Sequence, residues 1–150
     1  MIYYLLKGLH LLAMGVWLGA SITSPLDILR TLARGRPYVD LIPEQVARAD
    51  KIMIPAAALT ILTGLGLMQT TQGFVTAPWR FWAGFGLTVV LALIGKLGLD
   101  PTKKQLAVAV QGTGAGEAAL VGDLRGRFVT LITAWHVGFL LIFVLMLYPF

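Results

Sequence analysis

The sequence lacks cysteine altogether, and it has only two serines and two histidines among its 150 residues. Without cysteine the chain forms no disulfide, no thiolate-held iron–sulfur cluster and no thiolate copper site. The two serines, Ser21 and Ser24, do not supply a catalytic triad. Charged residues are also scarce, at 13% of the chain, whereas a soluble domain averages about 25%.

Apolar residues make up 57% of the chain, and the mean hydropathy is +0.81. They are gathered into four blocks, at about residues 2–24, 52–70, 79–99 and 127–148. Each block is close to the roughly 20 residues that a helix needs to cross a bilayer. The first block is too long for a signal-peptide core, so we interpret it as a retained helix. The pattern predicts a single integral membrane domain, residues 1–150, with no separate soluble domain.

The charged residues are sorted by side of the membrane. Of the twelve lysines and arginines, all but Lys7 and Arg80 lie in or beside the first and third connections, as do all seven acidic residues. Because positively charged loops stay in the cytoplasm, residues 25–51 and 100–126 are predicted to be cytoplasmic and both termini to face outward. The net charge of +5 is therefore a topology signal and not a nucleic-acid signal. We predict a multi-pass protein of the bacterial inner (cytoplasmic) membrane.

Short connections between consecutive helices favour antiparallel neighbours, so the fold class predicted is all-α, a transmembrane up-down-up-down four-helix bundle. Pro25 is expected to kink the first helix or to start a short interfacial one at residues 26–33. Residues 102–111 are expected to form a helix on the membrane surface, and the glycine-rich residues 112–116 a linker. Thr63 and the nearby glycines make the second helix thin. Glycines in the third helix allow close helix packing or leave room for a flat ligand.

The only two histidines, His10 and His136, lie inside the first and last apolar blocks. A titratable ring at membrane depth is costly, which makes each a candidate functional residue. At about 1.5 Å per residue, both lie near the midpoints of their helices. Two imidazoles at similar depth on neighbouring helices would hold one haem iron between them. The alternative is that each ring only hydrogen-bonds a neighbouring helix. Zinc would require three or four ligands, and copper would need help from methionines.

Four further residues are candidates for a cofactor site. Lys7 lies one turn outward of His10 and would either pair with an anionic propionate or extend to the interface. Arg80, at the outer start of the third helix, is the other candidate cation. Trp17 would stack on a macrocycle or anchor helix packing. Met14 is a candidate thioether ligand or a core residue. No carboxylate lies inside a predicted helix, so a carboxylate proton relay or a carboxylate-held di-iron site is not expected.

Several segments resemble a known superfamily. Residues 6–10, which read LKGLH, and residues 16–19, which read VWLG, resemble the first helix of HemJ-type protoporphyrinogen oxidases. They are also similar to the copper-resistance protein D family and to an uncharacterised bacterial family of four-helix membrane proteins. The helix at 79–99 followed by Asp100-Pro101, and the ending at 145–150, look most like the uncharacterised family.

The resemblance implies that His10 binds haem b, because a histidine of the first helix does so in HemJ-type proteins. Two features of those oxidases have no counterpart. The oxidases carry a functional lysine near the start of the third helix, whereas residues 79–84 contain none. They also carry an Asn-Glu pair near the start of the fourth helix, which is missing here, and His136 lies in that helix instead. The departures favour haem b held by two histidines, which suits electron transfer better than substrate oxidation.

The leading hypothesis is a membrane haem b protein that exchanges electrons with a quinone or another membrane redox partner. The first alternative is an enzyme, a HemJ-like protoporphyrinogen oxidase. The second is a copper-handling or non-catalytic accessory subunit, in which the histidines serve packing or bind metal transiently. A homo-oligomer is compatible with all three hypotheses, and a nucleic-acid partner is not expected.

Overall fold

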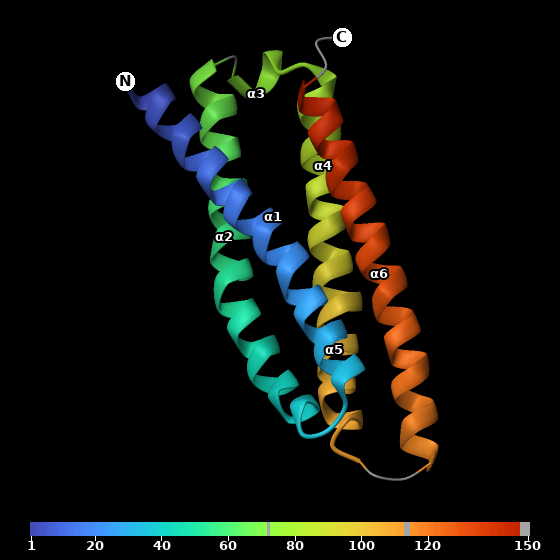
Figure 1. Ribbon diagram of the computed structural model, residues 1–150. Coiled ribbons are helices and arrows are strands. Elements are labelled where there is room, and N and C mark those ends of the chain that lie inside the picture. Colours follow the sequence, from blue (N-terminus) through green and yellow to red (C-terminus); the bar gives the residue numbers. More distant parts are fainter. Residues whose placement is uncertain (72, 113–114, 148–150) are drawn as a thin grey trace. The chain divides into compact units, whose positions relative to one another are not determined.

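The computed structural model of the chain describes residues 1–71, 73–112 and 115–147 (Figure 1). Helix accounts for 94% of these residues, and there is no strand among them. Within this part of the chain, four helical segments are long and apolar enough to cross a membrane: Ile2–Arg34, Tyr38–Thr71, Trp79–Ala109 and Gly116–Leu145. The prediction of an all-helical fold with four long apolar helices is confirmed.

The chain divides into two compact units. The first comprises Met1–Ala33 and Glu44–Ala77, and the second comprises Arg34–Pro43 and the chain from Pro78 onward. Each unit contains two of the four apolar segments.

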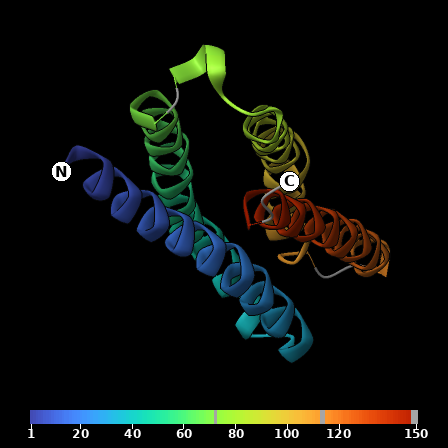
Figure 2. The same cartoon turned by 90° about the horizontal axis from the view of Figure 1, so that it is seen from above.

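The first unit is built on α1 (Ile2–Arg34) and α2 (Ile42–Thr71), and a single turn, α3 (Gly73–Thr76), follows. The two long helices run antiparallel and lie side by side in both ribbon views (Figures 1 and 2). Their register follows from two contacts. Leu6 packs against Gly66 near one end, and Gln45 Nε2 donates a 3.0 Å hydrogen bond to Thr31 Oγ1 near the other.

α1 does not stop at Pro25. It continues to Arg34, and Gly35, with a φ of 68°, follows it in the left-handed conformation that ends many helices. The separate interfacial helix expected at residues 26–33 is therefore the last part of α1. Hydropathy falls at this point, but backbone hydrogen bonding does not depend on hydropathy, so the helix extends beyond its apolar part.

The second unit contains η1 (Tyr38–Leu41), α4 (Trp79–Leu93), η2 (Ile94–Leu99), α5 (Asp100–Ala109) and α6 (Ala115–Leu147). α4, η2 and α5 follow one another without a break. The helix expected on the membrane surface at residues 102–111 is instead the continuation of this segment. α6 begins inside the linker expected at 112–116, of which residues 113 and 114 lie outside the described part. Residue 148, the predicted end of the fourth helix, and the rest of the ending lie outside it too.

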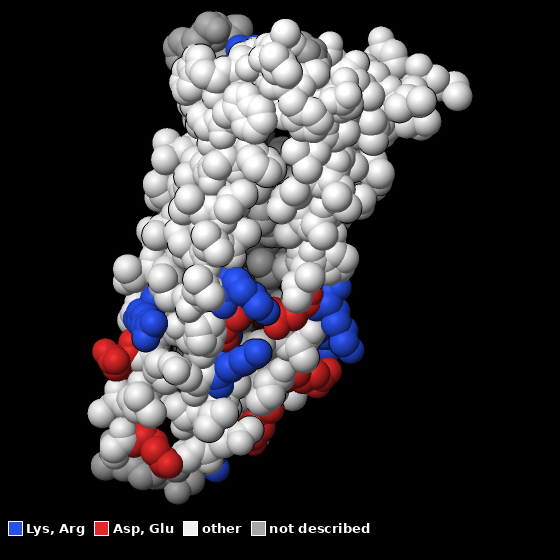
Figure 3. All heavy atoms as spheres, turned by 180° about the vertical axis from the view of Figure 1, so that it is seen from behind, with Lys and Arg blue, Asp and Glu red and all other residues white. Residues whose placement is uncertain are grey.

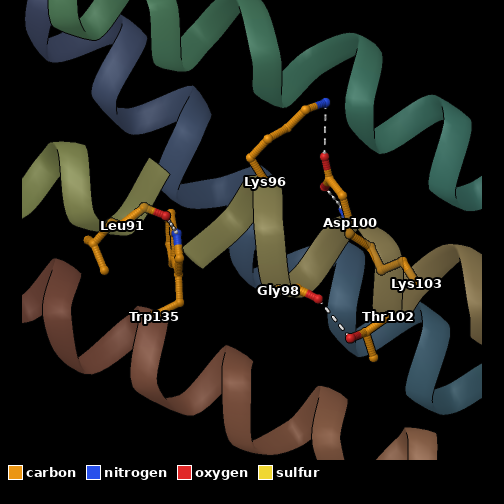
Figure 4. Close-up of polar contacts among 7 residues, drawn as sticks. All are labelled: Leu91, Lys96, Gly98, Asp100, Thr102, Lys103 and Trp135. Carbon is orange, nitrogen blue, oxygen red and sulfur yellow. Dashed lines mark hydrogen bonds and ion pairs between the residues drawn. The ribbon is translucent and has the colours of Figure 1, made fainter. Parts of the chain in front are cut away.

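The η2 segment is a π-helix, a wider turn that is frequent at functional sites. α6 packs antiparallel against α4, η2 and α5. Leu131 of α6 packs against Gly98 of η2, and Trp135 Nε1 donates a 3.2 Å hydrogen bond to the carbonyl oxygen of Leu91, near the end of α4 (Figure 4). Gly138, one turn further along α6, lies against the Leu91 side chain, where a Cβ atom would be 2.6 Å from Leu91 Cδ2.

A buried lysine follows the π-helix. Lys103 has a side chain only 8% exposed, and its Nζ lies 3.3 Å from Asp100 Oδ1. Lys96 Nζ, on an exposed side chain, lies 3.5 Å from the other carboxylate oxygen of Asp100 (Figure 4). Thr102 donates its hydroxyl to the Gly98 carbonyl at 2.7 Å. A polar cluster thus spans the end of the π-helix and the first turn of α5.

Charged side chains are concentrated toward one end of the helices in each unit. In the first unit most of them lie in the last part of α1 and the first part of α2, and in the second most lie in η2, α5 and the first part of α6. On the face drawn in Figure 3, lysine, arginine, aspartate and glutamate side chains are scattered over part of the helices, and most of the remaining surface is uncharged. The exposed surface of the apolar helices carries many large side chains, among them Leu12, Leu62, Leu97 and Leu140.

Candidate histidine sites

His10 is held by the neighbouring helix of its unit. It lies on α1, is partly buried, and places Nδ1 3.0 Å from the carbonyl oxygen of Thr60 and 3.0 Å from Thr63 Oγ1, both on α2. A carbonyl oxygen only accepts hydrogen bonds, so Nδ1 is the protonated nitrogen and donates. In the neutral ring, Nε2 then carries the lone pair.

The local sequence of α2 explains why the ring fits there. Thr63 is buried, and its hydroxyl donates to the Leu59 carbonyl at 2.6 Å, which leaves the Thr63 oxygen free to accept from His10. Gly64 follows, and a Cβ atom there would lie 3.2 Å from His10 Cε1. Because that separation is tighter than an ordinary contact, only glycine at position 64 leaves the ring its full space.

His136 is held within its own helix. Its Nδ1 lies 2.9 Å from the carbonyl oxygen of Ile132, four residues earlier on α6, so Nδ1 again donates. Its Nε2 is buried and has no hydrogen-bond partner within the described residues. The ring of Trp135 meets the His136 ring edge to face, with centroids 5.5 Å apart and an interplanar angle of 82°.

The two histidines therefore share one arrangement, in which Nδ1–H donates to a backbone carbonyl and Nε2 keeps its lone pair. This is the arrangement of metal-binding histidines, in which a hydrogen bond at one nitrogen fixes the tautomer and orientation of the other. A buried lone pair without a partner, as at His136, is uncommon in proteins. Each ring is chemically suited to bind a metal through Nε2.

The other predicted site residues are divided between the two units. Lys7, Met14 and Trp17 lie on α1 with His10, whereas Arg80 lies on α4 in the unit of His136. Lys7 is exposed, and its Nζ lies 5.9 Å from the centroid of the Tyr3 ring. Trp17 is 5% exposed, and Met14 is partly buried. The structure describes each set inside its own unit, so the pairing of His10 with His136 stays a prediction.

Two features were not identified as part of the site from the sequence. Thr60 and Thr63 accept the hydrogen bond of His10, and Gly64 gives the ring space, but the sequence marked Thr63 and Gly64 only as parts of a thin helix. Their spacing on α2 is visible in the sequence, yet nothing in it relates them to residue 10.

Among residues 1–71, 73–112 and 115–147, no group of three or more His, Asp or Glu side chains is placed to hold a metal ion.

Comparisons of the chain with protein-family models, with curated proteins and with solved structures find no match.

Proposed function

We propose that this chain is a small membrane haem b protein that transfers electrons, with His10 and His136 as the two axial ligands of one haem. The observation that carries this proposal is the shared state of the two rings. Each is the only histidine of its unit, each lies in a long apolar helix, and each has Nδ1 engaged with a backbone carbonyl and Nε2 available.

The residues present fit haem better than a bare metal ion. The buried Nε2 of His136 has no hydrogen-bond partner in the described chain, and an axial bond to iron would satisfy it. Among the described residues no group of three or more His, Asp or Glu is placed to hold a metal ion, and two imidazoles are too few for a tetrahedral zinc site. They are sufficient for a haem, whose iron takes four ligands from the macrocycle and two from the protein.

The roles of the protein groups follow from their chemistry. When bound, haem b supplies one-electron chemistry between the ferric and ferrous states, and two histidine ligands leave no open coordination position for a substrate. The imidazoles of His10 and His136 would hold the haem, and the carbonyls of Thr60 and Ile132 orient the imidazoles. The apolar helices exclude water. Lys7, three residues before His10, is the candidate partner of an anionic propionate, and Arg80 is a second. The electron partner proposed is a quinone or a membrane redox protein.

The topology is part of the same proposal. The four apolar segments form an up-down-up-down bundle in the bacterial inner membrane, with residues 25–51 and 100–126 in the cytoplasm and both termini outside. Ten of the twelve basic residues lie in these loops or within four residues of them, which supports this orientation. The family relationship to HemJ-type and copper-resistance D proteins is likewise a proposal, based on the motifs around His10.

A visible absorption spectrum tests the proposal. Protein purified in detergent from haem-replete cells is expected to show a Soret band and, after reduction, the α-band of a low-spin b-type haem. His10→Ala and His136→Ala are each expected to abolish the pigment or to convert it to a high-spin form. Leu12→Ala, two residues from His10 at a position that is 65% exposed, is the control on the same helix and is expected to keep the spectrum.

A colourless protein, or histidine variants with an unchanged spectrum, would contradict the proposal. One equivalent of copper in the purified protein without haem would favour the copper-handling alternative. Complementation of a strain that lacks protoporphyrinogen oxidation would favour the enzyme.

A further inference from the structure

The two histidines are held by different parts of the structure. His136 hydrogen-bonds a carbonyl of its own helix, so its orientation depends on α6 alone. His10 hydrogen-bonds the backbone and a side chain of the neighbouring helix α2. Its orientation therefore depends on how α1 packs against α2.

We propose that Thr63 and Gly64 are positioning residues that orient His10 and set the strength of its Nε2 as a ligand. This inference depends on the proposed function for its meaning in the holoprotein. Its geometric part concerns the apoprotein as well, because Thr63, Gly64 and His10 belong to the same unit.

Thr63 acts through the direction of its hydroxyl hydrogen bond. Its Oγ1 donates to the Leu59 carbonyl at 2.6 Å and lies 3.2 Å from the Thr60 carbonyl, so its proton is directed at the backbone. Thr63 Oγ1 therefore presents a lone pair to His10 Nδ1. Together with the Thr60 carbonyl, this places two acceptors around one N–H. An acceptor at Nδ1 makes the imidazole more electron-rich and so makes Nε2 a stronger ligand.

Gly64 acts through space. The hypothetical Cβ atom, 3.2 Å from His10 Cε1, would move the ring by a few tenths of an ångström. Alanine is otherwise the better residue inside a helix, by roughly 1 kcal/mol over glycine. Glycine at position 64 is therefore expected to be favoured because it leaves space for the His10 ring, and not because it stabilises the helix. A Cβ atom added at Gly66, two residues later, would lie 3.4 Å from Leu6 Cδ1, which is an ordinary contact.

The chain supplies matched controls for both residues. Thr60 is buried on the same helix, and its hydroxyl donates to the Ala56 carbonyl at 2.8 Å, but only its backbone reaches His10. Thr60→Val thus removes an equivalent hydroxyl without touching the ring. Gly66→Ala adds an equivalent methyl group on the same helix. Thr63→Ser keeps the hydroxyl and serves as the rescue variant.

The first experiment uses the apoprotein, without haem. The chain has two histidines, so nitrogen-15 NMR of histidine-labelled protein in detergent shows two rings, and the ring lost in His10→Gln is His10. The wild-type His10 is expected to have a protonated Nδ1 and an unprotonated Nε2. Thr63→Val is expected to shift the Nδ1 resonance, whereas Thr63→Ser and Thr60→Val leave it near the wild-type position. Equal shifts in Thr63→Val and Thr60→Val would overturn the role of Thr63.

The second experiment is a double-mutant cycle on the unfolding midpoint of the apoprotein. Gly64→Ala is expected to lower the midpoint when His10 is present and to leave it unchanged or raise it in the His10→Ala background. Gly66→Ala is expected to have the same effect in both backgrounds. The same loss for Gly64→Ala with and without His10 would overturn the role of Gly64, because residues in contact must show coupling.

The third experiment uses titration with iron protoporphyrin IX. Thr63→Val is expected to weaken haem binding by about tenfold, at the low end for a lost outer hydrogen bond, because the Thr60 carbonyl remains. It is also expected to raise the reduction potential, since a less electron-rich imidazole stabilises ferric iron less. Haem binding with the same affinity and potential in Thr63→Val and Thr60→Val would overturn the inference and leave the proposed function standing. The opposite result, altered His10 resonances with no haem binding, would refute the proposed function alone.

Discussion

The indole nitrogen of Trp135 lies 3.2 Å from the carbonyl oxygen of Leu91, and the Leu91 side chain lies against Gly138. One residue of α4 thus receives a hydrogen bond from α6 through its backbone and a close packing contact through its side chain. Both contacts come just before the π-helix η2 and next to His136, so we expect them to fix the part of α6 that carries this histidine.

Replacing Trp135 should weaken the second unit, because it removes both the indole N–H and part of a ring that is only 4% exposed. Trp135→Phe is expected to lower the free energy of unfolding in detergent by about 1–3 kcal/mol. The control is Trp82→Phe, at a side chain that is 48% exposed, with an expected change within about 0.5 kcal/mol. Equal effects of the two substitutions would argue against a stabilising role for this hydrogen bond.

Adding a methyl group at the α4–α6 contact should force the helices or the Leu91 side chain to move. Gly138→Ala places a Cβ atom 2.6 Å from Leu91 Cδ2 and is expected to destabilise the protein by about 1–3 kcal/mol. Gly122 lies on the same helix with nothing within 4 Å of its hypothetical Cβ. Gly122→Ala is therefore expected to be neutral or to stabilise by up to about 1 kcal/mol. Thermal unfolding of both variants measures the difference, and a stable Gly138→Ala would mean that Leu91 repacks freely.

The buried lysine should depend on its carboxylate partner. Lys103→Met leaves Asp100, which is only 20% exposed, without its buried cation, and is expected to lower the free energy of unfolding by about 3 kcal/mol. Lys104→Met, at the adjacent exposed position, is expected to change it by less than about 0.5 kcal/mol. The double variant Lys103→Met, Asp100→Asn should recover part of the loss, because it removes a carboxylate that keeps only the exposed Lys96 as its partner. No recovery would indicate that Lys103 is stabilised mainly by other groups.

The absence of cysteine makes the proposed topology easy to test. Single cysteines are introduced at Val75, which is 98% exposed, and at Val108, which is 72% exposed. A membrane-impermeant maleimide added to intact cells is expected to label Val75→Cys and not Val108→Cys, and to label both after the membrane is opened. Labelling of Val108→Cys in intact cells would contradict the proposed orientation.

The apolar helices could be predicted because hydropathy is a local property. The blocks at 2–24 and 52–70 lie inside α1 and α2, the block at 79–99 is covered by α4 and η2, and the described part of the block at 127–148 lies inside α6. The ends of the helices could not be predicted in the same way. α1 passes through Pro25, and α4 continues through η2 into α5, because backbone hydrogen bonds extend past the point where the side chains become polar.

The candidate site was predictable only in its central residues. His10 and His136 stand out because ionisable rings are rare in apolar helices. Thr63 and Gly64 do not stand out, since a threonine and a glycine on a membrane helix are ordinary. Their relation to His10 requires the register between α1 and α2, which side-chain packing sets and no local pattern reveals. The burial of Lys103 is a further example, because its sequence neighbours Lys104 and Asp100 give no sign of it.

The sequence by itself determined that this chain is helical, that four of its segments are apolar enough for a membrane, and that its two histidines lie within them. Composition and the order of charges are read from the chain residue by residue, so these properties do not depend on which residues become neighbours in space. Only the tertiary structure decided that His10 donates to α2 while His136 donates to its own helix. That difference arises from contacts between residues about fifty positions apart, and such contacts exist only once the helices have packed.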